Sequence, residues 1–104
     1  MIRIIDGKRY NTETATKVTF LDTPYHGGDF KYEETSLYVT KNGAWFLAGR
    51  GGPMTRWARK TGQSEWSSGE GIQPILPSEA RAFLEQDGET ALIEQYFGNL
   101  IQDA

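Results

Sequence analysis

The fold is decided by one stretch of the chain, Leu37-Tyr38-Val39-Thr40-Lys41-Asn42-Gly43-Ala44-Trp45-Phe46-Leu47-Ala48. Two β-rich runs flank Asn42-Gly43, a dipeptide that favours the positive φ values of a two-residue hairpin turn. Such a turn sets the pairing as Lys41–Ala44, Thr40–Trp45, Val39–Phe46, Tyr38–Leu47 and Leu37–Ala48. The sequence therefore predicts a hairpin whose turn fixes the central register.

Both faces of this hairpin are apolar in the predicted register. Either helices cover the second face, or Tyr38, Trp45 and Leu47 form an exposed aromatic platform. Coverage is favoured, because the remaining chain supplies helices that must bury their own apolar stripes.

Strand patterns lie on both sides of the hairpin. Asp6-Gly7 predicts a short hairpin within residues 1–10, because it also suits a two-residue turn. Lys17–Leu21 alternates apolar and polar residues and is typical of a strand. Ile72–Leu76 is predicted as an edge strand, because Pro74 cannot donate a ladder hydrogen bond.

Three segments carry helical patterns. A short helix is expected after Pro53, with Met54, Trp57 and Ala58 on one buried stripe. Two further helices are expected near the end of the sequence, one with Ser78 as its N-cap and one over Glu89–Phe97. The predicted fold is α+β, a single domain over residues 1–104. It has an antiparallel sheet of about four to five strands with two to three helices packed on it.

Composition restricts the cellular setting and the chemistry. The chain has no cysteine, which excludes disulfides and thiolate sites and is consistent with a reducing compartment. Residues 1–7 do not have the pattern of a signal peptide, and no apolar run approaches the roughly 20 residues of a membrane span. A cytoplasmic protein that does not contact membranes is expected.

The charges are divided unevenly along the chain. Residues 1–60 hold ten basic and six acidic residues, a net +4, whereas residues 61–104 hold one basic and eight acidic residues, a net −7. One hypothesis places a negative partner-binding face on the C-terminal helices, able to dock on a basic groove. Its residues are Glu79, Glu85, Asp87, Glu89 and Glu94. The alternative is that these side chains only solvate two surface helices.

A second candidate surface surrounds the Gly-rich segment 49–53. Glycine backbone at the start of a helix can present N–H groups to an anion, and nearby tryptophans would allow bases of a single strand to stack. This candidate anion or nucleic-acid site comprises Arg50, Gly51, Gly52, Arg56, Arg59 and Lys60. The alternative is that the glycines only turn the chain, and the net charge of −3 disfavours direct nucleic-acid binding.

Residues suited to catalysis are scarce. His26 is the only histidine, and no cysteine or second histidine is present to complete a common metal site. No Gly-x-Ser-x-Gly elbow marks a nucleophilic serine. We therefore expect a binding protein rather than an enzyme, with no catalytic residues, no metal and no cofactor.

Five segments, spread over most of the chain, resemble a group of small uncharacterised proteins of bacteriophages and mobile elements. They are Asp6-Gly7-Lys8-Arg9-Tyr10-Asn11-Thr12-Glu13-Thr14-Ala15, Trp45-Phe46-Leu47-Ala48-Gly49-Arg50-Gly51-Gly52-Pro53-Met54-Thr55, Trp57-Ala58, Glu65-Trp66-Ser67-Ser68-Gly69-Glu70-Gly71-Ile72 and Pro77-Ser78-Glu79-Ala80. This resemblance implies an accessory protein that binds, and inhibits, a host defence complex that targets nucleic acid, as anti-restriction and anti-CRISPR proteins do. The alternatives are a nucleic-acid-binding accessory protein and a protein-interaction module without a defence role.

Overall fold

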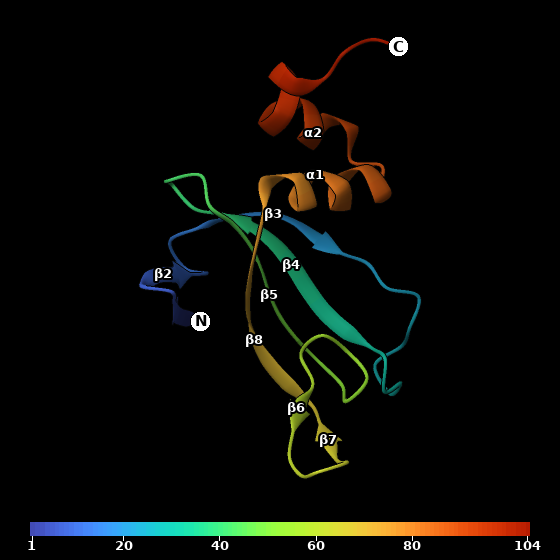
Figure 1. Ribbon diagram of the computed structural model, residues 1–104. Helices are drawn as coiled ribbons and strands as arrows, with labels where there is room; N and C mark the ends of the chain where they lie inside the picture. Colours follow the sequence, from blue (N-terminus) through green and yellow to red (C-terminus); the bar gives the residue numbers. More distant parts are fainter.

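The computed structural model describes residues 1–104, and its centre is a four-stranded antiparallel sheet in the order β3-β4-β5-β8 (Figure 1). Its strands are β3 (Thr16–Leu21), β4 (Glu33–Val39), β5 (Trp45–Gly51) and β8 (Gly69–Ile75). Two small hairpins and two α-helices complete the fold: β1 (Ile2–Ile5) with β2 (Lys8–Asn11), β6 (Arg59–Lys60) with β7 (Trp66–Ser67), α1 (Pro77–Gln86), and α2 (Thr90–Phe97), which continues into the 3₁₀ turn η1 (Gly98–Leu100). The α+β class is confirmed.

The central hairpin forms where it is expected, but its predicted register is wrong by one residue. The Gly43 N–H donates to the Thr40 carbonyl at 3.0 Å, and the Thr40 N–H donates to the Ala44 carbonyl at 2.8 Å. The loop therefore has three residues, with only Gly43 at a positive φ, 85°. The observed pairs are Leu37–Leu47, Tyr38–Phe46 and Val39–Trp45.

The hairpin predicted within residues 1–10 is confirmed, and it forms the two-residue turn that the central hairpin lacks. Asp6 and Gly7 both adopt positive φ values, 51° and 76°, and Ile5 pairs directly with Lys8. The two φ values are those of a type I′ turn.

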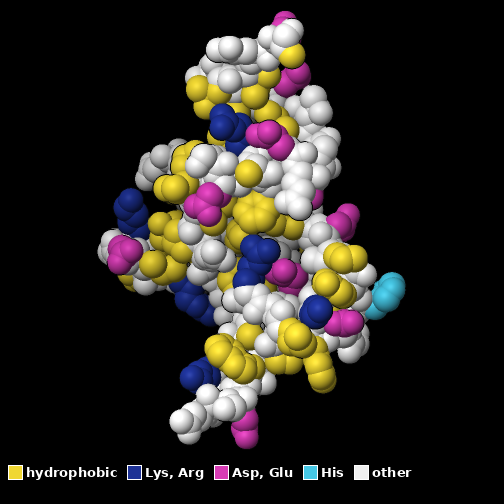
Figure 2. Space-filling model, turned by 45° about the vertical axis from the view of Figure 1, so that its right-hand side comes forward, with side chains coloured by type: hydrophobic (Ala, Val, Ile, Leu, Met, Phe, Trp, Pro, Cys, Tyr) yellow, Lys and Arg dark blue, Asp and Glu magenta, His cyan; other side chains and the backbone are white.

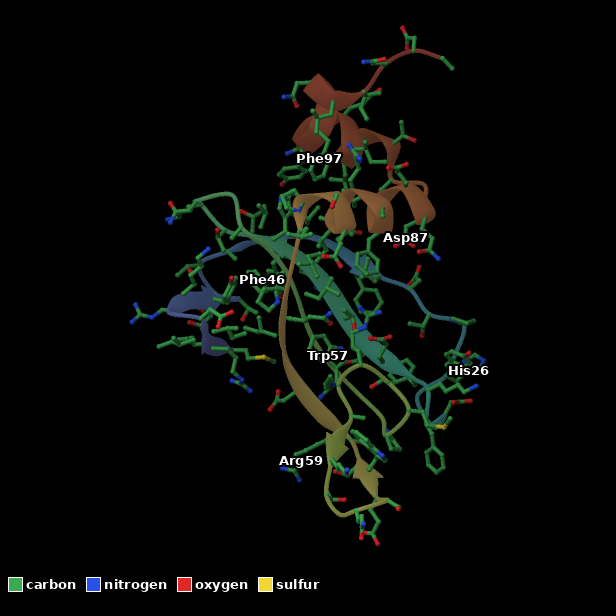
Figure 3. All side chains as sticks on the ribbon, in the orientation of Figure 1. His26, Phe46, Trp57, Arg59, Asp87 and Phe97 are labelled. Atoms are coloured by element: carbon green, nitrogen blue, oxygen red, sulfur yellow. The ribbon has the colours of Figure 1, made fainter.

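The shifted register decides which side chains face the helices. Leu37, Trp45 and Leu47 are buried together with apolar residues of α1 and α2, and the Trp45 ring stacks 5.3 Å from Phe97. On the opposite face of the sheet, Phe46 is buried beneath Tyr10 of the β1–β2 hairpin. Figure 3 labels Phe46 in the sheet and Phe97 in the helical layer. Helices thus cover Leu37, Trp45 and Leu47 on one face, and the β1–β2 hairpin covers Phe46 on the other, where Tyr38 also lies rather than beside Trp45 and Leu47.

The short helix predicted after Pro53 is wrong. Its residues form turns that lead into β6, and Met54 is exposed where the helical stripe would bury it. Two backbone donors at the start of this segment bond to another loop, the Gly52 N–H to the Tyr32 carbonyl and the Met54 N–H to the Phe30 carbonyl, and the Thr55 and Ala58 N–H groups close single turns within the segment. One isolated helical turn gains too few hydrogen bonds to compete with such contacts.

The start of α1 also differs from the prediction. Pro77, not Ser78, is the first helical residue, and the Leu76 N–H donates to the carboxylate of Glu79 at 3.0 Å. The helices lie at one end of a molecule 49 Å long, and the β6–β7 hairpin lies at the other end (Figure 1). Neither helix has both the length and the apolar character that crossing a bilayer requires.

Replacing Gly43 with valine is expected to lower the free energy of unfolding by about 1–3 kcal/mol, because a β-branched side chain resists a positive φ. Space is not the cause, because no atom lies within 4 Å of a Cβ at this position. Urea unfolding of the Gly43→Val and Asn42→Val variants would measure the effect, with Asn42 as the control at negative φ. Equal stability of the two variants would contradict the three-residue loop.

Candidate functional site

The acidic residues expected to form one face are dispersed over the two helices. Glu79 bonds to the start of α1, and Glu85 pairs with Arg81 at 3.5 Å on the same helix. Glu79 and Glu85 are six positions apart, which places them about 120° apart around the axis of α1. Asp87 ends α1 and Glu89 precedes α2. Of the five, Glu85 and Glu94 line one shallow groove between the helices.

The basic residues of the second candidate surface are also separated. Arg50 pairs with Glu34 at 2.8 Å, and Arg56 pairs with Glu33 at 3.0 Å. Because Glu33 and Glu34 are consecutive in β4, their side chains leave opposite faces of the sheet, and the two arginines follow them. Arg59 and Lys60 lie further out, on β6, while Gly51 pairs with β8 and Gly52 bonds to Tyr32.

A different surface appears where three loops gather between the helical layer and the tip of the β6–β7 hairpin (Figure 1). We name this surface the loop end; it comprises residues 22–32, 52–58 and 61–68. Four large apolar or aromatic side chains are exposed there: Phe30 by 66%, Met54 by 60%, Trp66 by 55% and Tyr25 by 39%. Figure 2 shows hydrophobic side chains gathered between the tip of the β6–β7 hairpin and the loop that carries His26. Exposed apolar groups gathered in this way mark interaction sites in soluble proteins.

Close backbone packing holds two of these loops against each other. A Cβ at Gly52 would lie 2.6 Å from the Phe30 carbonyl oxygen, so only glycine permits this approach. The Met54 N–H then donates to the same carbonyl at 3.0 Å. Phe30 and Met54, 24 positions apart in sequence, are thereby neighbours at the loop end.

A buried hydrogen-bond network anchors the loop that carries Met54. The Trp57 indole N–H donates to the Thr35 hydroxyl at 2.8 Å, and that hydroxyl donates to the Glu33 carboxylate. Glu33 also forms an ion pair with Arg56, whose guanidinium lies 5.7 Å from the centre of the Phe83 ring on α1. The loop end is therefore tied to both the sheet and the helical layer.

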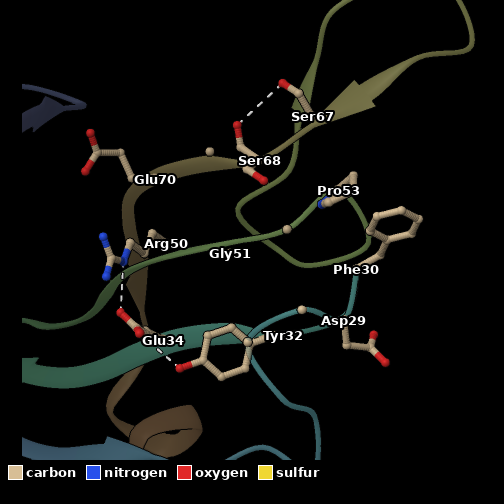
Figure 4. A pocket seen from close by; sticks show the side chains of 14 residues that line it. Asp29, Phe30, Tyr32, Glu34, Arg50, Gly51, Pro53, Ser67, Ser68 and Glu70 are labelled. Carbon is tan, nitrogen blue, oxygen red and sulfur yellow. Dashed lines mark hydrogen bonds and ion pairs between the residues drawn. The ribbon is translucent and has the colours of Figure 1, made fainter.

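An open groove of about 960 Å³ crosses the loop end. Figure 4 shows the side chains that line it, from the loop before β4, from β4, β5 and β8, and from the β7–β8 junction. Residues Glu34, Arg50 and Glu70 are in register across three adjacent strands, so they project from the same face of the sheet. Tyr32 donates to Glu34 from beside this row, at 2.9 Å.

The Tyr32–Glu34–Arg50 contacts shift the ionisation of all three groups. Hydrogen bonds from Arg50 and then Tyr32 hold the pKa of the Glu34 carboxyl below its usual value. The hydrogen bond to Glu34 raises the pKa of the Tyr32 hydroxyl, and the same carboxylate raises the pKa of Arg50. Glu34 is therefore ionised, and Tyr32 and Arg50 protonated, throughout the physiological pH range.

His26, the only histidine, is exposed in the loop before β4. No group of three or more histidine, aspartate or glutamate side chains comes together in a way that would hold a metal ion.

The sequence does not predict the loop end. The helical pattern places Met54 on a buried stripe, Trp66 is a candidate only for stacking on nucleic-acid bases, and Phe30 and Tyr25 receive no role. A large aromatic residue within a loop rich in glycine and polar residues, such as Tyr25 or Trp66, is the available signal, because nothing nearby predicts its burial. Phe30 and Met54 become one surface only through tertiary packing.

Comparisons with protein-family models, with curated proteins and with solved structures find no match to this chain. The resemblance to small phage and mobile-element proteins therefore remains a prediction.

Proposed function

We propose that the protein acts by binding a partner protein through the loop end. The supporting observation is the joint exposure of Phe30, Met54 and Trp66, with the loop of Met54 anchored by a buried network and bonded to the loop of Phe30. Burying one such side chain contributes about 1.5–3 kcal/mol. Aromatic residues on an ordered surface supply most of the affinity in protein interfaces, because little conformational freedom is lost on binding.

The charge balance of this region favours a protein partner over nucleic acid. The loop end and the strand residues that flank it, residues 22–34 and 50–70 together, hold six acidic and five basic residues. Two of the basic groups, Arg50 and Arg56, are already paired with carboxylates. Nucleic-acid surfaces need an excess of positive charge to displace counterions from phosphates, and this region has none.

The identity of the partner follows only from the resemblance. We retain the hypothesis that the partner is a host complex that targets nucleic acid and that binding inhibits it. An acidic surface on the helices, around Glu85 and Glu94, is the alternative to the loop end as the contact with that partner.

Site-specific photo-crosslinking tests this proposal. A benzoylphenylalanine at position 30 or 66 is expected to form an adduct with one protein in host cells, because these side chains would be buried in the complex. The same group at position 4 is the control, because Ile4 is as exposed as Phe30 but belongs to the β1–β2 hairpin.

Three outcomes contradict the proposal. Adducts of equal yield at positions 4 and 30 would show that contact is unspecific. Adducts at position 85 or 94 without adducts at the loop end would move the interface to the acidic helices. A nucleic-acid adduct at position 66 would favour the alternative function, a nucleic-acid-binding accessory protein.

A further inference from the structure

We propose that the groove at the loop end receives an arginine side chain, carried by an extended segment of the partner protein. This inference rests on the proposed function, because it names the chemistry of the segment that the loop end binds. It is carried by three features of the groove: an excess of carboxylates, two aromatic rings, and a wall of small residues.

The carboxylates outnumber the cations that face them. Asp29, Glu34 and Glu70 line the groove, and Arg50 is its only basic residue. Arg50 bonds to Glu34 through its Nε atom at 2.8 Å, whereas Glu70 takes part in no side-chain hydrogen bond or ion pair. A net charge of −2 therefore faces the groove, and a cation is the complementary ligand.

Aromatic rings line the same groove. Phe30 and Tyr32 are both part of its wall. A guanidinium group combines favourable contact with an aromatic face and bidentate hydrogen bonding to a carboxylate. Lysine supplies the charge without the planar geometry, which is why arginine is the ligand we name.

The rest of the wall allows a peptide backbone to come close. It consists mainly of residues with small side chains, Gly27, Gly28, Gly51, Gly52, Ser67 and Ser68. The volume of about 960 Å³ is large enough for an arginine and its neighbours in an extended segment. Apolar neighbours of that arginine would contact the exposed Phe30 and Met54 at the rim.

Other ligands fit the groove less well. An anion would meet Arg50 only beside the carboxylates of Glu34 and Glu70, which flank it on the neighbouring strands. A metal ion would need several carboxylates within reach of one point, and the groove does not gather them in this way.

An NMR titration of the whole protein tests the inference. The probe is the peptide acetyl-Gly-Leu-Arg-Leu-Gly-amide, and its control carries citrulline, an uncharged analogue of nearly the same shape, in place of arginine. The arginine peptide is expected to shift the backbone amides of Gly51, Gly52 and Ser68 saturably, with the citrulline peptide at least about fivefold weaker. A lysine peptide is expected to fall between them.

Two protein variants locate the site. Glu70→Gln is expected to weaken binding of the arginine peptide about three- to tenfold, because it removes the free carboxylate. Glu85→Gln is the matched control on α1 and is expected to bind as the unmodified protein does. Both side chains are exposed, so unchanged melting temperatures verify that folding is not the cause.

Several results overturn the inference. They are equal binding of the arginine and citrulline peptides, shifts centred on Glu85 and Glu94, and no saturable shift up to about 10 mM peptide. A failed peptide titration together with a specific cross-linked adduct at position 30 would refute arginine as the ligand of the groove and leave the proposed function standing. An absence of adducts at the loop end would refute the proposed function itself.

Discussion

Replacing Trp57 with alanine is expected to lower the free energy of unfolding by about 3–5 kcal/mol, a large part of the stability of a small domain. The Trp57 side chain is buried, and its ring lies 3.5 Å from the position a Cβ would take at Gly71. Removing it opens a cavity between the sheet and its loop, and the Thr35 hydroxyl loses the indole donor. Urea unfolding followed by circular dichroism measures the change.

Two further variants separate the causes. Trp57→Phe retains much of the ring but lacks the N–H, so it is expected to cost less than alanine and more than about 1 kcal/mol. Met54→Ala, in the same loop, is expected to change the stability by less than about 0.5 kcal/mol, because its side chain is exposed. Equal effects of Met54→Ala and Trp57→Ala would show that Trp57 does not anchor the loop.

The two Xaa-Gly turns illustrate what the sequence can determine about the fold. Asp6-Gly7 and Asn42-Gly43 look alike, and both mark hairpins correctly. Loop length is not encoded in the dipeptide, because a glycine at positive φ serves two-residue and three-residue loops equally. At Gly43 the Ala44 N–H donates to the Thr40 hydroxyl, a contact that accompanies the longer loop. The class of fold was therefore predictable, whereas the register was not.

The segment after Pro53 shows why the site was less predictable than the fold. Met54, Trp57 and Ala58 have the spacing of a helical stripe, but a period of one turn is weak evidence. Trp57 is buried as the pattern predicts, yet it reaches the sheet from a loop. Carbonyls of a loop more than twenty residues earlier in the chain decide the conformation of Met54, and such partners cannot be identified from local spacing.

The double variant Phe30→Ser, Trp66→Ser is expected to bind the cross-linked partner at least about 100-fold more weakly than the unmodified protein. The reason is that both side chains belong to the proposed partner-binding surface at the loop end. Two aromatic side chains at the centre of an interface each carry about 2 kcal/mol or more, and serine removes the apolar area while remaining soluble. The matched control is Ile2→Ser with Ile4→Ser, which removes two similarly exposed side chains from β1. The control is expected to bind within about twofold of the unmodified protein.

Charge reversal on the helices distinguishes this surface from the acidic one. The helices lie at one end of a molecule 49 Å long and the β6–β7 hairpin, which carries Trp66, lies at the other, whereas charges are screened beyond about 8 Å at physiological ionic strength. Changing Glu85, Glu89 and Glu94 to lysine is therefore expected to alter affinity for the partner by less than about threefold, with little dependence on salt. A loss of tenfold or more that grows at low salt, while Phe30→Ser with Trp66→Ser binds normally, would place the interface on the helices. Because each set of substitutions leaves the other surface intact, the two affinities measured across a salt series decide between the surfaces.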